Sequence, residues 1–118
     1  MSCEKSRDPV QGGAVFLPLP LRRGGRILVE VVSEGPHCVP CEYAIAAVEY
    51  VAEDYEDRID VRIVETKRAE DAQRYFELCR IYGGLVPVPS ILFSGVVAFE
   101  GIPGPDELRE ALQKELGK

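Results

Sequence analysis

Two cysteines three residues apart, Cys38 and Cys41, constrain this sequence more than any other feature. Residues 26–33 precede them and are rich in β-branched side chains, which predicts a central strand. Residues 42–55 follow, contain no Gly or Pro, and have apolar residues at helical spacing. Cys38 is therefore expected at the start of a helix and Cys41 one turn inside it. A C-x-x-C pair at such a junction is typical of a dithiol redox site.

This predicted position suits thiol chemistry. Two cysteines on one helical turn approach closely enough for a disulfide, and the unpaired N–H groups and dipole of the helix start favour a thiolate. Lowering a thiol pKa from ~8.5 to ~7 takes roughly 2 kcal/mol. A helix terminus supplies about 0.3–1 kcal/mol at an exposed site, so a hydrogen bond from the Cys41 side would have to add to it. Pro40 fits a first helical turn, and a protonated His37 would add a minor contribution at neutral pH.

Composition excludes several classes of function. Of the 118 residues, 20 are acidic and 14 basic, for a net charge of -6, which argues against binding to nucleic acid or an anionic membrane. No run of ~18 apolar residues is present, so no membrane span is predicted. Residues 1–8 lack the apolar core of a secretory signal. The expected location is the cytoplasm, where four cysteines do not form a structural disulfide framework.

We expect one folded domain over residues 26–118 and an N-terminal extension over residues 1–25. Residues 1–13 are polar and expected to be mobile. Residues 14–21 contain two prolines and predict an extended segment, and residues 22–25 predict a turn.

The domain alternates between strand-like and helix-like segments. The predicted elements are strand 26–33, helix 38–55, strand 59–65, helix 69–82, a hairpin of 88–93 and 96–99, and helix 105–116. The apolar face of the second helix is predicted to comprise Tyr75, Phe76, Cys79 and Tyr82. Gly83 and Gly84 should end that helix. The order βαβ-α-ββα predicts an α/β fold with a four-stranded mixed sheet and helices on both faces.

This order of elements, with its motifs, resembles the thioredoxin superfamily, closest to the small archaeal-type thioredoxins that are also called glutaredoxin-like. The resemblance covers residues 26–116. It rests on residues 38–41 (Cys-Val-Pro-Cys), 88–91 (Val-Pro-Ser-Ile), 94–97 (Ser-Gly-Val-Val) and 100–108. It implies a thioredoxin-like fold, Cys38 as the nucleophile, Cys41 as the resolving thiol, and Pro89 as a cis-proline beside them.

The activity that this resemblance implies is reduction of protein disulfides through a mixed disulfide, without a cofactor or metal. The partners would be disulfide-containing protein substrates and an electron donor of the thioredoxin-reductase type. Val88 would offer its backbone to an extended substrate, whereas Pro87 is expected to be an ordinary trans residue. The other predicted substrate contacts are His37, Val39 and Pro40. The family usually has Trp in place of His37 and Gly-Pro between the cysteines, and residues 35–36 are an apparent addition to the family pattern.

Glu30 interrupts the apolar run of the first strand and is predicted to be buried. A buried carboxylate without a partner is costly, and such a group is able to take the proton of Cys41, through a water. Thioredoxins resemble this chain in having a buried acid at the matching place, usually Asp. The alternative is a carboxylate that reaches solvent or pairs with an arginine.

Other interpretations of the cysteines stay open. A zinc site would need two more ligands than the pair supplies, and the chain offers only His37, Cys3 and Cys79. A glutathione-linked enzyme is disfavoured because residues 101–107 are acidic where an anion would bind. A non-catalytic module, or a metal carrier using the motif and His37, is the remaining alternative. Cys79 is expected to pack as a small hydrophobe or to act as a third redox thiol, and Cys3 to be incidental.

Overall fold

The structure is a computed structural model that describes residues 22–23 and 26–117. The predictions for residues 1–21, which include the extended segment 14–21 and Cys3, lie outside the described residues. So do Gly24 and Gly25 of the predicted turn.

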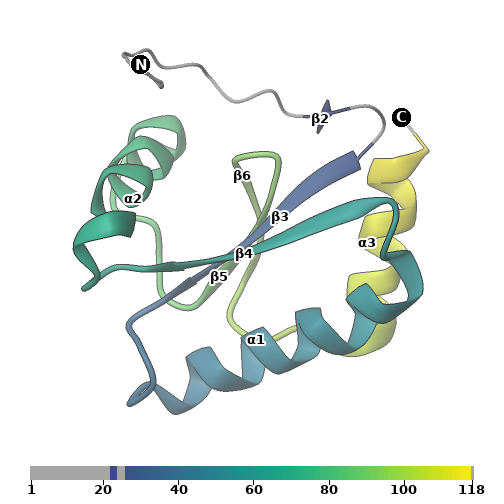
Figure 1. Cartoon of the computed structure of the whole chain (residues 1–118), viewed down its shortest axis with the longest axis horizontal. Helices are drawn as coiled ribbons and strands as arrows, with labels where there is room; N and C mark the ends of the chain where they lie inside the picture. The colour runs from purple at the N-terminus through teal and green to yellow at the C-terminus, as the bar shows by residue number, and fades with distance from the viewer. Residues whose placement is uncertain (1–21, 24–25, 118) are drawn as a thin grey trace.

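A mixed sheet forms the centre of the domain (Figure 1). β3 (Arg26–Ser33) pairs in parallel with β4 (Ile59–Glu65) on one side. On its other side β3 pairs antiparallel with β5 (Ser90–Phe93), which pairs with β6 (Val96–Glu100). These are the four expected strands, so the predicted sheet is confirmed. A two-residue strand, β2 (Arg22–Arg23), was predicted as part of a turn but pairs antiparallel with the start of β3.

Within residues 26–117, three helices cover the sheet. α1 (Val39–Ala52) and α3 (Pro105–Leu116) pack on one face, where they cover alternate residues of β3, and α2 (Ala69–Tyr82) packs on the other. A 3-10 turn, η1 (Glu53–Tyr55), extends α1. The predicted fold class, with helices on both faces, is confirmed.

The larger core lies between the sheet and the pair α1 and α3. Its buried members are Ile27, Val29, Val31, Ala44, Val48, Val51, Ile59, Ile91, Phe93, Leu108 and Leu112. A smaller core lies under α2 and comprises Val32, Val64, Leu78, Val86 and Leu92. Because side chains of a strand alternate between faces, β3 contributes to both cores. Packing on both faces fixes β3, and with it the start of the loop that leads to Cys38.

The predicted apolar face of α2 is wrong in part. Phe76 and Tyr82 are 64% and 44% exposed, whereas the buried residues of the helix are Asp71, Arg74 and Leu78. Asp71 and Arg74 are tolerated inside because both carboxylate and guanidinium groups have hydrogen-bond partners there. A polar side chain that is buried with a partner does not appear in a pattern of apolar residues.

Within the described part of the chain, none of the helices has the length and apolar character needed to cross a membrane.

Candidate active site

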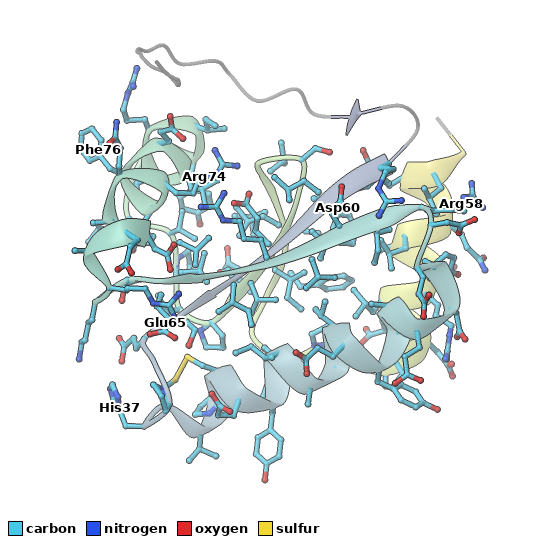
Figure 2. All side chains as sticks on the ribbon, in the orientation of Figure 1. His37, Arg58, Asp60, Glu65, Arg74 and Phe76 are labelled. Carbon is cyan, nitrogen blue, oxygen red and sulfur yellow. A yellow bond between two sulfur atoms is a disulfide. The ribbon has the colours of Figure 1, made fainter. Side chains whose placement is uncertain are left out.

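Cys38 and Cys41 form a disulfide at the N-terminal end of α1, with their Cα atoms 5.2 Å apart (Figure 2). Cys38 has extended backbone angles and caps the helix, and its Sγ accepts a hydrogen bond from the Cys41 N–H at 3.3 Å. This N–H is one of the first-turn donors that has no partner within the helix. The helix start therefore directs a donor at the sulfur of Cys38, where a thiolate would carry its charge.

The two sulfurs differ in exposure. Cys38 is half-buried, whereas Cys41 has no exposed surface. The Sγ of Cys41 also accepts a hydrogen bond from the Glu34 N–H, at 3.5 Å. An incoming disulfide therefore has access to Cys38, and Cys41 is shielded behind it.

The loop between β3 and α1 is folded tightly around Gly35, which has a φ of +118°. Gly35 donates a hydrogen bond to the Oγ of Ser33 at 2.9 Å and accepts one from the Cys38 N–H at 3.0 Å. A Cβ at this position would lie 3.6 Å from the ring of His37 and 3.8 Å from the Oε1 of Glu65. Figure 2 shows His37 and Glu65 on the same side of the molecule as the disulfide. His37 thus borders the site as an exposed side chain.

The peptide bond between Val88 and Pro89 is cis, as the resemblance implied. β5 begins at Ser90, which is paired with Val32 of β3, so Pro89 lies at the level of Ser33. The next residue along β3 is Glu34, whose N–H binds Cys41. We call residues 83–89, which connect α2 to β5, the proline loop. The register brings this loop to the same end of the sheet as the disulfide.

Glu30 is fully buried, as predicted, but the expectation that it lacks a partner is wrong. Arg74 of α2 donates from Nε to Glu30 Oε2 at 2.7 Å and from Nη2 to Glu30 Oε1 at 2.5 Å. Burial lowers the pKa of Arg74, but hydrogen bonds and charge attraction to Glu30 and Glu77 outweigh burial, and the pKa is raised overall. The guanidinium of Arg74 therefore stays charged. The alternative that the Glu30 carboxylate pairs with an arginine is thus correct.

Arg74 is the residue of this region that the sequence reasoning missed. It was not included in the apolar face predicted for its helix, although a buried acid in the neighbouring strand creates a need for a cation. By register, Arg62 of β4 lies directly beside Glu30 and would have been the nearest candidate from the sequence. Instead the side chain of Arg62 is 51% exposed, and its Nη2 lies 3.9 Å from the Oδ1 of Asp71.

Curated proteins similar to this chain are archaeal thioredoxins. A probable thioredoxin of Methanothermobacter marburgensis is 33% identical over 90 residues, which cover 76% of this chain and 96% of that relative. A probable thioredoxin of Methanothermobacter thermautotrophicus is 34% identical over 85 residues, covering 72% and 92%. A thioredoxin of Methanocaldococcus jannaschii is 33% identical over 81 residues, covering 69% and 87%. The chain belongs to the thioredoxin family.

The comparison with solved structures agrees with this at the level of the fold. Among solved structures, the crystal structure of chloroplastic thioredoxin z matches with a TM-score of 0.57 and 18% identity. The match covers 77% of this chain and 79% of that chain, and it shows the shared fold alone. No family model matches the chain.

Membership of the thioredoxin family shows that the chain is a thiol–disulfide oxidoreductase, and the Cys38–Cys41 disulfide agrees with that reaction class. Among the described residues, Cys79 is the free cysteine, half-buried on α2. No group of three or more His, Cys, Asp and Glu side chains suited to a metal ion occurs in that same part of the chain.

Proposed function

We propose that this thioredoxin reduces disulfides of other proteins in the cytoplasm through the Cys38–Cys41 couple, and that a donor of the thioredoxin-reductase type recycles it. The observation that supports this best is the asymmetry of the pair. A half-buried sulfur caps the helix and receives an N–H hydrogen bond, and a fully buried sulfur lies one turn behind it. This division fits an attacking thiol and a resolving thiol.

In the first step, the Cys38 thiolate attacks one sulfur of the substrate disulfide. A bond forms between Cys38 and that sulfur while the substrate S–S bond breaks, and the second substrate sulfur leaves as a thiolate that takes a proton from water. The N–H of Cys41 stabilises the Cys38 thiolate before attack.

In the second step, Cys41 loses its proton and attacks the Sγ of Cys38. The mixed disulfide breaks, the substrate leaves fully reduced, and the enzyme is left oxidised as the Cys38–Cys41 disulfide. Two electrons and two protons have passed to the substrate, and the donor returns them to the enzyme. No cofactor or metal takes part in this proposal.

Substrate binding is assigned to the proline loop and to the exposed residues of the motif. The carbonyl of Pro87 accepts from the Ser90 hydroxyl at 2.6 Å, and the carbonyl of Pro89 accepts from the Gly101 N–H at 2.9 Å. Between them, the backbone N–H and carbonyl of Val88 have no hydrogen-bond partner among the residues that the structure describes. These two groups are the ones that an extended substrate would pair with.

Side chains around Cys38 would contact the same substrate. His37 and Pro40 are exposed, and Val39 is 60% exposed. An exposed apolar residue beside the nucleophile favours a folded or extended protein chain over a small polar disulfide as the substrate.

We also propose Glu30 as the acceptor of the Cys41 proton in the second step. Both of its oxygens receive hydrogen bonds from Arg74, so the pair has a structural role in any case. The two roles are separated by Glu30→Gln. An acceptor role predicts slower release of substrate from the mixed disulfide at unchanged rates of its formation. Equal rates of substrate release in the variant and the parent protein would show that Glu30 does not accept the proton and that the Glu30–Arg74 pair is only structural.

The proposed function is tested by measuring reduction of a protein disulfide, with a dithiol as the electron donor. The parent protein should turn over, Cys38→Ser should be inactive, and Cys3→Ser should match the parent. Turnover supported by glutathione alone would favour a glutathione-linked enzyme. Stoichiometric zinc or copper in the purified protein, without reductase activity, would favour a metal carrier.

A further inference from the structure

We propose that Tyr75 and Cys79, one helical turn apart on α2, are positioning residues that hold the proline loop in the form that binds substrate. This inference deepens the proposed function and rests on it. Neither residue touches the disulfide or the reacting atoms. They act through Val86, which lies in this loop between α2 and β5.

Val86 is anchored on both of its backbone polar groups. The Tyr75 hydroxyl donates a hydrogen bond to the Val86 carbonyl at 2.9 Å. The Val86 N–H donates in turn to the Sγ of Cys79 at 3.4 Å. Val86 is 2% exposed, so neither group has water as a ready substitute. Two side chains of α2 therefore satisfy the backbone N–H and carbonyl of Val86, as hydrogen bonds to neighbouring strands satisfy those of β5.

The two hydrogen bonds at Val86 also restrict the backbone of Val88, because the connection between these residues is stiff. Only Pro87 separates the two residues, and its ring fixes the φ angle of the backbone. Beyond Val88, the carbonyl of Pro89 is fixed to Gly101 at 2.9 Å. The free backbone groups of Val88 are thus held between two anchors. Loosening the Val86 anchor would let Val88 move relative to the disulfide.

Tyr75 keeps its hydroxyl proton over the physiological range of pH. Burial raises the pKa of Tyr75 to about 12, and interactions with Cys79 and Glu34 act in the same direction. The hydroxyl therefore keeps its proton at neutral pH and remains a donor to Val86.

The choice of substrate separates a positioning role from a general structural one. A small disulfide such as 2-hydroxyethyl disulfide offers no peptide backbone to Val88, so its reduction tests the thiols alone. A disulfide-bonded peptide with an extended strand next to its cysteine requires the loop. The two substrates are assayed with Tyr75→Phe, which keeps the ring, and with Cys79→Ala, which removes the sulfur acceptor.

We expect kcat/KM for the peptide to fall about fivefold to tenfold in Tyr75→Phe, which leaves the buried Val86 carbonyl without its donor. The fall should be smaller in Cys79→Ala, because a thiol sulfur is a weak acceptor. The loss should come mainly from a higher KM. Reduction of the small disulfide should stay within about twofold of the parent. Cys79→Ser supplies another acceptor at the same place and should recover part of the loss. Tyr55→Phe is the matched control, because its hydroxyl bonds to Gln113 on the opposite side of the sheet, and both substrates should be reduced normally.

An equal loss for the two substrates, or no loss for the peptide, would overturn the inference. If Cys79→Ala fails to fold, Tyr75→Phe decides the question by itself. A parent protein that reduces neither substrate would overturn the proposed function as well, and that result is distinguishable because it needs no variant.

Discussion

Arg74 and Glu30 form a two-point ion pair between α2 and the central strand β3, with N–O distances of 2.7 and 2.5 Å. Glu30 has no exposed surface and Arg74 is 8% exposed. Arg74 also donates to Glu77 at 3.0 Å from its third nitrogen, so the guanidinium is satisfied on several sides. This pair is a buried polar link between the helix and the sheet, and its two hydrogen bonds explain why two charged residues are stable in the interior.

Removal of Arg74 alone should be strongly destabilising. In Arg74→Met, the carboxylate of Glu30 stays buried without its partner, and we expect the free energy of unfolding to fall by about 3–5 kcal/mol. The measurement is urea denaturation followed by circular dichroism. The double variant Glu30→Leu/Arg74→Met removes both charges and should regain most of that loss. A single variant within ~1 kcal/mol of the parent would contradict a desolvated pair.

Gly35 should not tolerate a side chain. Its φ of +118° is a conformation that other residues adopt only at a cost, so Gly35→Ala should destabilise the fold by about 1–3 kcal/mol. It should also slow reduction, because the turn at Gly35 sets the position of Cys38. Gly84→Ala is the control, since its Cβ would meet nothing within 4 Å and its φ is not left-handed. Equal unfolding free energies of the two variants would show that the Gly35 turn carries no constraint.

Tyr75 should make the fold sensitive to alkaline pH. Its pKa rises from the ordinary 10.0 to about 12 in the folded protein. Below pH 10 the hydroxyl is protonated in both states, and its contribution to stability is complete. Between pH 10 and 12 the unfolded chain loses this proton first, so stability falls as pH rises. Urea midpoints across this range should decline less steeply in Tyr75→Phe than in the parent, and parallel declines would refute the raised pKa.

Much of the fold followed from local signals in the sequence. The end of α2 and the start of α3 were predicted correctly because glycine and proline mark them. Gly83 ends α2 with a φ of +91°, and Pro105 stands in the first turn of α3. The alternation of strand and helix patterns then left few topologies to choose from, which is why the sheet was predicted correctly.

The errors arose where distant residues meet. Arg74 is buried because of Glu30, which is 44 positions away in the chain, and no pattern within α2 reveals that partner. Tyr75 packs against the smaller core under α2 as predicted, but no local pattern reveals its hydrogen bond to the Val86 carbonyl. β2 was missed because two residues followed by glycines carry no strand pattern of their own. Polar contacts between elements depend on the assembled fold, whereas hydrophobic periodicity and glycine or proline signals are already visible in the sequence.

The most direct test of the account is to trap the reaction halfway. Cys41→Ser removes the resolving thiol, so a mixed disulfide with a protein substrate should accumulate, and peptide mapping by mass spectrometry should place it on Cys38. Cys38→Ser should trap nothing under the same conditions. Adducts on Cys79, or none at all in Cys41→Ser while the parent still reduces the substrate, would contradict the assignment of Cys38 as the attacking sulfur.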